Sequence, residues 1–205
     1  LTYRFMWDSA PEGGGLTLQD AWARWMFSDQ IGVRMGQFKD LLTHEWLTDD
    51  GRQLAAERSV VDFILGGGFV QRTQGVTLVY GGYEKGNPLN VEIGFTDGLN
   101  QQNTNFVSKG GSGFPGAAHT FDFGITGRAE YLAMGNWKDY ADFSAMGTKE
   151  NLLVFGGGFD WSQSGDGNVL SVAIDGQFEM SNGLSIYGGG LYRFADDNIT
   201  GLGDD

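Results

Sequence analysis

The chain of 205 residues contains no cysteine, only 3 prolines and no apolar stretch as long as a transmembrane helix. The absence of cysteine excludes disulfides, thiolate metal sites and cysteine nucleophiles. A helix that crosses a bilayer needs about 20 mainly apolar residues, so the sequence excludes that class of membrane protein. Basic residues are also few: 13 Lys and Arg against 26 Asp and Glu give a net charge of -13, which disfavours nucleic-acid binding and a polybasic membrane anchor.

Glycine is abundant instead, with 35 residues, and aromatic residues make up 14% of the chain. Disordered glycine-rich segments contain few aromatics, so this composition predicts an ordered protein. The glycine runs 156–158 and 188–190 lie inside apolar segments, where we expect bends or close backbone approach in a curved sheet. No shift in composition marks a second domain, so we expect a single domain over residues 1–205.

Apolar and polar residues alternate with a period of two in residues 121–131, and again in 89–96 and 170–180. This period is typical of a strand with one apolar and one wet face. A strand that crosses a bilayer needs about 9–11 residues, whereas strands of soluble domains have about 5–6. The alternation therefore predicts an all-β fold, an antiparallel meander that forms part of a transmembrane β-barrel.

Nine strands are expected, joined by Asx-Gly turns at 97–98, 166–167 and 182–183. They are 2–7, 16–27, 31–38, 73–82, 88–96, 120–132, 151–161, 168–180 and 184–194. The longer connections, 39–72, 98–119 and 133–150, predict one rim with long loops and another with short turns.

Residues 40–72 form a long connection, and irregular alternation within 52–65 predicts a turn or two of helix. Long loops inside compact domains are often functional. We expect this segment to fold into the barrel as a constriction loop. The alternative is a helical loop packed outside on the rim.

Four segments in order carry a family resemblance: Leu18-Gln-Asp-Ala-Trp-Ala-Arg-Trp25, Ile31-Gly-Val-Arg-Met-Gly-Gln-Phe-Lys39, His44-Glu-Trp-Leu-Thr48 and Glu57-Arg-Ser59. This series resembles the phosphate-selective porins of the O and P type. The resemblance implies a 16-stranded, homotrimeric outer-membrane barrel with an inward loop, which passes small hydrophilic solutes or ions. Because nine strands are fewer than such a barrel has, we expect a chain truncated at both ends.

Charged residues on the polar faces of the strands and in the loop are the candidate pore residues. They are Arg24, Arg34, Lys39, Arg52, Arg58, Arg128, Asp20, Glu92, Asp122 and Glu130, with Asp175 and Glu179 as further lumen candidates. The first five are the expected anion-attracting cluster, because they lie on or beside the strands that flank the loop. Arg58 has an alternative structural role, pairing with Glu57 or Asp62. Anions such as phosphate are candidate solutes, but the mixed charge means that the family's phosphate selectivity is not carried over.

Aromatic residues near the expected strand ends would form belts at the two lipid interfaces. They are Trp7, Trp25, Phe27, Trp161, Tyr192 and Phe194. The alternative is burial in the core of a sandwich.

No catalytic, metal or cofactor site is expected, since His44 and His119 each lack the spaced partners of a zinc site. The sequence thus predicts a non-enzymatic porin of the bacterial outer membrane, in contact with lipid, lipopolysaccharide and copies of itself. Two alternatives stay open. One is a soluble or surface-exposed β-sandwich with a structural or adhesive role, and the other is a plugged barrel that acts as the scaffold of an envelope complex.

Overall fold

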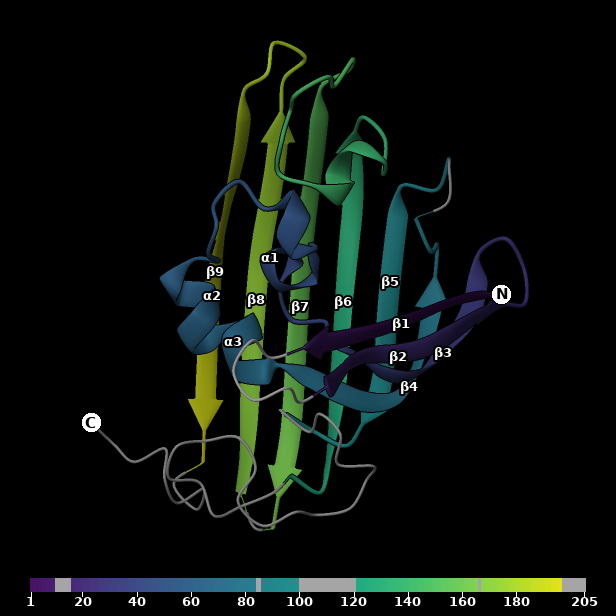
Figure 1. Ribbon diagram of the computed structural model, residues 1–205, viewed down its shortest axis with the longest axis vertical. Coiled ribbons are helices and arrows are strands. Elements are labelled where there is room, and N and C mark those ends of the chain that lie inside the picture. Colours follow the sequence, from purple (N-terminus) through teal and green to yellow (C-terminus); the bar gives the residue numbers. More distant parts are fainter. Residues whose placement is uncertain (10–15, 84–85, 100–120, 166, 197–205) are drawn as a thin grey trace.

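The computed structural model describes residues 1–9, 16–83, 86–99, 121–165 and 167–196, which form one sheet of nine antiparallel strands in sequence order (Figure 1). The strands are β1 (Thr2–Ser9), β2 (Leu16–Met26), β3 (Ile31–Lys39), β4 (Arg72–Tyr80), β5 (Leu89–Thr96), β6 (Phe123–Met134), β7 (Leu152–Ser164), β8 (Gly167–Glu179) and β9 (Ser185–Ala195). The predicted all-β meander and its nine strands are confirmed. Three parts of these expectations lie outside the described residues. They are most of the connection 98–119, residue 120 of the expected sixth strand and residue 166 of an expected turn.

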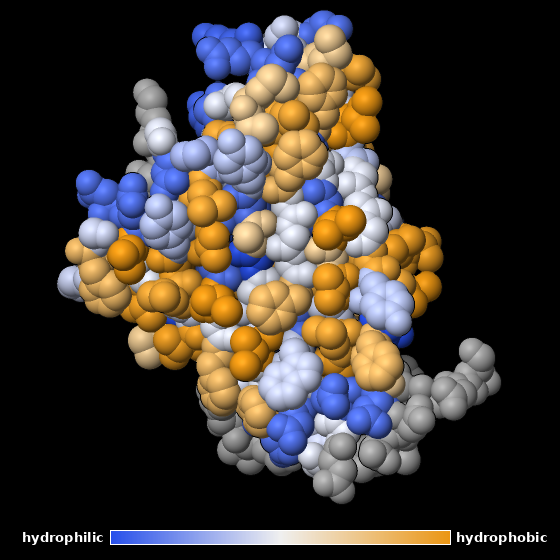
Figure 2. Space-filling model, turned by 180° about the vertical axis from the view of Figure 1, so that it is seen from behind, coloured by the Kyte–Doolittle hydropathy of each residue, from blue (hydrophilic) through white to orange (hydrophobic). Residues whose placement is uncertain are grey.

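The two faces of the sheet differ in chemistry because side chains alternate along each strand. On β5, Ile93 and Phe95 are exposed on the convex face, whereas Glu92 is buried on the concave face. On β6, Ile125 and Tyr131 follow the same rule. Figure 2 shows apolar side chains across the middle of the convex face and hydrophilic ones towards its two ends. In the described ranges no second sheet covers this face, as a sandwich would require.

The sheet curls strongly over its concave face. In Figure 1, β1 and β2 cross in front of the long strands β5 and β6. Arg24 on β2 reaches Glu92 on β5, with 3.4 Å between Nη2 and Oε2, although β3 and β4 lie between these strands in the sheet order. The concave face is therefore partly enclosed, as expected for part of a barrel wall.

The connection between β3 and β4 lies on this concave face. It contains α1 (His44–Leu47), the 3-10 helix η1 (Asp50–Arg52), α2 (Val60–Leu65) and α3 (Gly67–Val70). Side chains cap two of these helices: Thr43 accepts a hydrogen bond from the Trp46 N–H, and Ser59 accepts one from the Asp62 N–H. Its apolar residues join a buried cluster with β8 that contains Leu42, Trp46, Phe69, Val70, Leu99, Phe121, Val169 and Ala173. None of the helices within the described ranges is long and apolar enough to cross a membrane.

A second inward connection, residues 135–151 between β6 and β7, leaves the opposite end of the sheet. Its 3-10 helix η2 (Asp139–Ala141) contains the buried Tyr140. The Phe143 N–H donates to the Arg52 carbonyl at 3.3 Å, so this connection meets the one between β3 and β4. The expectation that all the long connections share one rim is wrong, because successive connections of a meander alternate between the two ends.

The convex face gives a first prediction. Replacing Ile93, at the middle of β5, with Arg should cost about 2–4 kcal/mol of folding free energy in phospholipid vesicles, the cost of a cation on the lipid face of a barrel. Leu54→Arg is the matched control, because Leu54 is also apolar and exposed but lies in the connection on the concave side. Equal losses for the two variants, measured by reversible denaturant titration, would contradict a lipid-facing convex surface.

Candidate functional site on the concave face

Arg128 on β6 is the most highly bonded charge of the concave face, and it is 4% exposed. Its Nε donates to Glu130 at 2.7 Å, and its two terminal nitrogens donate to the Asp175 carboxylate at 2.9 and 2.6 Å. Nη1 also donates to the Leu42 carbonyl at 3.3 Å, and Nη2 to the Tyr140 hydroxyl at 3.3 Å. One guanidinium therefore joins β6, β8 and both inward connections.

Two glycines of β7 make the room for this arrangement. Gly156 stands between Glu130 and Asp175 in the cross-strand register, and a Cβ there would come within 2.3 Å of Arg128 Nη2. At Gly158 a Cβ would lie 2.2 Å from the Leu42 carbonyl oxygen. The absence of side chains lets the connection between β3 and β4 lie directly against the sheet, so the predicted close approach at 156–158 is observed.

The start of this connection is held by a buried carboxylate. Asp40 Oδ1 accepts from the Thr126 hydroxyl and from the Leu42 N–H, both at 3.1 Å. The Asp160 side chain on β7 interacts with the Asp40 carboxyl, and burial raises the pKa of Asp40 to about 7. The root of the segment is thereby fixed to β6 and β7.

His44 lies between the two inward connections. Its ring stacks on Tyr140 with 3.8 Å between centroids, and its Nδ1 is 3.9 Å from Glu130 Oε1. Burial lowers the pKa of His44 to about 4, although the Glu130 charge opposes the shift. The imidazole is therefore neutral at pH 7 and serves as a packed aromatic ring.

A second charged cluster lies on the curled part of the sheet. Glu92 on β5 pairs with Arg34 on β3 at 2.7 Å and with Arg24 on β2 at 3.4 Å. Both guanidinium groups also lie over the Trp22 ring, at 5.6 and 5.8 Å from its centroid. Two cations thus share one carboxylate and one aromatic face.

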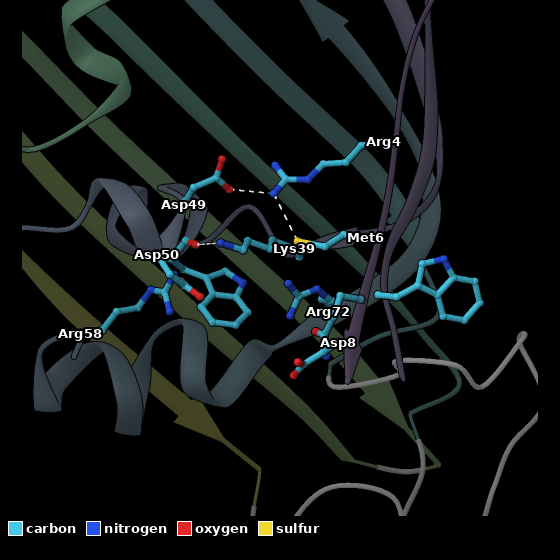
Figure 3. Close-up of a pocket in the computed structure, with 11 residues that line it drawn as sticks. Arg4, Met6, Asp8, Lys39, Asp49, Asp50, Arg58 and Arg72 are labelled. Atoms are coloured by element: carbon cyan, nitrogen blue, oxygen red, sulfur yellow. Dashed lines mark hydrogen bonds and ion pairs between the residues drawn. The ribbon is translucent and has the colours of Figure 1, made fainter. Parts of the chain in front are cut away.

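A third cluster surrounds a cavity of about 350 Å³, here called the Trp46 pocket (Figure 3). It is lined by Arg4, Met6, Trp7, Asp8, Gln19, Lys39, Trp46, Asp49, Asp50, Arg58 and Arg72. The buried Asp20 behind it accepts from Arg72 Nε at 2.9 Å and pairs with Arg4 Nε at 3.1 Å. Arg4 also donates to Asp49 Oδ1 at 2.9 Å. The pocket thus brings together residues of the four strands β1, β2, β3 and β4 and residues of the connection between β3 and β4.

Three cations converge on the Trp46 indole at the floor of this pocket. Lys39 Nζ, Arg58 Cζ and Arg72 Cζ lie 5.1, 4.9 and 5.6 Å from the ring centroid. Lys39 donates to the carbonyls of Trp46 and Thr48 at 2.9 and 3.2 Å. The ring is therefore covered by cations, an arrangement favoured by its quadrupole.

The structure divides the expected anion-attracting cluster. Arg24 and Arg34 belong to the Glu92 cluster, and Lys39 and Arg58 belong to the Trp46 pocket with Asp20 behind it. Arg52 is exposed and donates to the Ala141 carbonyl at 3.5 Å. Two further candidates lie apart: Asp122 is exposed and accepts from the Gly165 N–H, and Glu179 bonds Thr148 and Gln177.

The alternative role given to Arg58 needs a correction. It does hold the connection together, but its carboxylate partner is Asp50, not Glu57 or Asp62. It also donates to the carbonyls of Glu45 and Thr48 at 3.2 and 3.1 Å.

The expected belt residues lie towards the two ends of the strands. Five of them are exposed: Trp7, Trp25, Phe27, Tyr192 and Phe194. Trp161 is half-buried and packs edge-on against Phe123 at 5.5 Å between centroids. Their contact with the lipid interface stays a prediction.

Sequence reasoning missed Arg4, Asp49, Asp50 and Arg72, which complete the Trp46 pocket. Arg4 lies between aromatic residues on β1, where an alternation of apolar and polar residues could have placed it on the polar face. Asp49 and Asp50 lie within the connection, where no periodicity guides the assignment, and Arg72 is the first residue of β4. Among the described residues, no group of three or more His, Asp or Glu side chains could hold a metal ion. His119 lies outside the described residues.

A family model described as phosphate-selective porin O and P matches residues 2–120, more than half of the chain. The chain belongs to this porin family. No curated protein and no solved structure matches it. The matched region of the porin runs through β5 and includes the whole Trp46 pocket, whereas Arg128 and Asp175 lie outside it.

The Arg128 cluster gives a second prediction. Arg128→Met leaves the buried Glu130 and Asp175 without their cation, so the porin should lose about 3–5 kcal/mol of stability. Arg193→Met is the matched control, because Arg193 on β9 has no carboxylate partner in the described chain and its guanidinium lies over Phe69 and donates to the Ile64 carbonyl. It should lose less than about 1 kcal/mol. Thermal unfolding in detergent compares the two, and similar losses would contradict the special role of Arg128.

His44 gives a third prediction. Its folded-state pKa of about 4 is below the unfolded value of 6.5, so the unfolded chain binds a proton first as the pH falls. The stabilisation is complete above about pH 6.5 and is lost progressively towards pH 4, by up to about 3 kcal/mol. His44→Gln should flatten this dependence between pH 6.5 and 5 in denaturant titrations. A variant as acid-sensitive as the parent there would show that another group is responsible.

Proposed function

We propose that this porin is an outer-membrane channel through which small hydrophilic solutes or ions diffuse passively. The observation that carries the proposal is the chemistry of the two faces of one curled sheet. The convex face is apolar and exposed, whereas the concave face carries the charged clusters of Arg128, Glu92 and the Trp46 pocket. This is the pattern of a barrel wall between lipid and a wet lumen.

Residues 40–72 act in this proposal as the constriction loop. The segment lies on the concave face, where its backbone touches β7 at Gly158 and accepts a hydrogen bond from Arg128. The connection 135–151 meets it from the other end of the sheet through the stacked His44 and Tyr140 rings. Together they narrow the lumen from both ends.

The charges of the lumen favour weak ion selectivity. Arg24 and Arg34 share Glu92, and Arg128 is held between Glu130 and Asp175. Ion pairs of this kind give a local transverse field rather than one sign of charge along the pore. Anions such as phosphate are therefore among the solutes that pass, without a strong preference for them.

Membership of the family supports the remaining assignments of the proposal. The porin resides in the bacterial outer membrane, contacts lipid and lipopolysaccharide, assembles as a homotrimer and has no enzymatic activity. Its convex apolar face supports the contact with lipid.

Single-channel recording in planar bilayers tests the channel, with the reversal potential under a salt gradient as a measure of selectivity. Stepwise openings with a small reversal potential are expected. Folded protein that gives no openings would reject the channel and favour a plugged scaffold, and a strong anion preference would reject the balanced lumen.

Deleting residues 42–58 gives the fourth prediction. The deletion removes α1, η1 and the Trp46 floor, so single-channel conductance should increase because the lumen widens. Leu54→Ser is the control, since this exposed side chain lies in the same segment and should leave conductance unchanged. Circular dichroism verifies folding of the deletion variant, and a folded variant with unaltered conductance would reject the constriction.

A further inference from the structure

The Trp46 pocket, together with Asp20 behind it, contains as many carboxylates as cations, although the chain belongs to a family described by phosphate selectivity. Its cations are Arg4, Lys39, Arg58 and Arg72. Its carboxylates are Asp8, Asp49 and Asp50 in the lining, with Asp20 behind them. A pocket with no net charge offers an inorganic anion little attraction, because the carboxylates repel it as much as the cations attract it.

Two of the cations nevertheless keep donors for a ligand. Arg72 uses Nε for Asp20, and within the described residues its two terminal nitrogens have no hydrogen-bond partner. Lys39 donates to two backbone carbonyls and forms no ion pair with a described carboxylate. Both side chains line the cavity, so they present positive donors to a carboxylate that enters it.

The acidic side chains of the pocket keep hydrogen-bond acceptors for a positively charged group of a ligand. Asp49 gives Oδ1 to Arg4, and among the described residues its Oδ2 accepts no hydrogen bond. The Asp49 side chain is 44% exposed and lines the cavity, so its carboxylate is accessible to a solute. Figure 3 shows Lys39 and Arg72 between Asp49 on one side and Asp8 on the other. Donors at the centre and acceptors at the periphery form a dipolar site.

The pocket does not suit a sugar. A sugar ring stacks on an open aromatic face, but Trp46 is 8% exposed and its ring is surrounded by Lys39, Arg58 and Arg72. The indole N–H is also in use, because it donates to the Gln71 carbonyl at 3.1 Å. The indole therefore positions the cations instead of contacting a solute.

We propose that the Trp46 pocket binds small zwitterions with a carboxylate and an ammonium group, the class of amino acids and short peptides. The carboxylate binds Lys39 and Arg72, and the ammonium group binds Asp49. The cavity of about 350 Å³ is at the small end of ligand sites, which suits a solute of this size. This inference rests on the proposed channel for its biological role, since it names a class of solute that the pore would take.

Calorimetric titration of the folded chain in detergent tests the pocket. Glycylglycine is the probe, and propionate, inorganic phosphate and glucose are the comparison ligands. Glycylglycine should bind at least about tenfold more tightly than each of the other three, because only it uses both charged sides of the pocket. Tighter binding of phosphate or glucose, or no binding of glycylglycine, would overturn the proposal.

Asp49→Asn identifies the ammonium site and gives the fifth prediction. The variant should bind glycylglycine about tenfold more weakly and propionate more tightly, because an acceptor for the ammonium group and a repulsive charge are both removed. Asp29→Asn is the matched control, since it makes the same change at an exposed position in the turn between β2 and β3 and should alter neither affinity. If Asp49→Asn binds glycylglycine as tightly as Asp29→Asn does, the assignment of the ammonium site is rejected. Calorimetry needs no conductance and channel recording needs no ligand, so the pocket and the channel can fail separately.

Discussion

The buried guanidinium of Arg128 has to be satisfied from four directions, and this requirement fixes the arrangement of the concave face. Its partners come from β6, from β8, from the Leu42 carbonyl and from Tyr140. A buried cation without carboxylate partners is unstable, so the two inward connections and the sheet must be in place together. Gly156 and Gly158 permit this because they leave the space that side chains would fill.

The same constraint explains why residues 40–72 lie against the wall. The segment is tied at its root by Asp40 to Thr126, along its path by the Leu42 carbonyl, and by His44 stacked on Tyr140. Apolar burial of Leu42, Phe69 and Val70 with Val169 and Ala173 of β8 adds a non-directional contribution. A segment held by several independent contacts keeps one position, as a constriction of defined width requires.

Charge on the concave face is arranged as neighbouring opposites. Arg24 and Arg34 share Glu92, Arg4 and Arg72 share Asp20, and Arg128 bridges Glu130 and Asp175. Such pairing cancels the field at long range but leaves strong local fields of both signs. A lumen of this kind suits passage of polar solutes in general, and the cavity of the Trp46 cluster suits a solute that itself carries both charges.

The sequence by itself determined the nine strands, their two faces and the presence of a partly helical segment after β3. These features depend on neighbours in the chain: side chains alternate with a period of two, and Thr43 and Ser59 start their helices through local hydrogen bonds. Candidate charges such as Arg128 and Glu92 could be placed on the polar face for the same reason. The ion-pair partners of these charges could not be predicted from the sequence. Arg24 meets Glu92, and Arg128 meets Asp175, only because of the curl of the sheet and its cross-strand register. The Trp46 pocket was likewise decided by tertiary structure, since Arg4, Asp49 and Arg72 come together only when β1 curls over the inward segment.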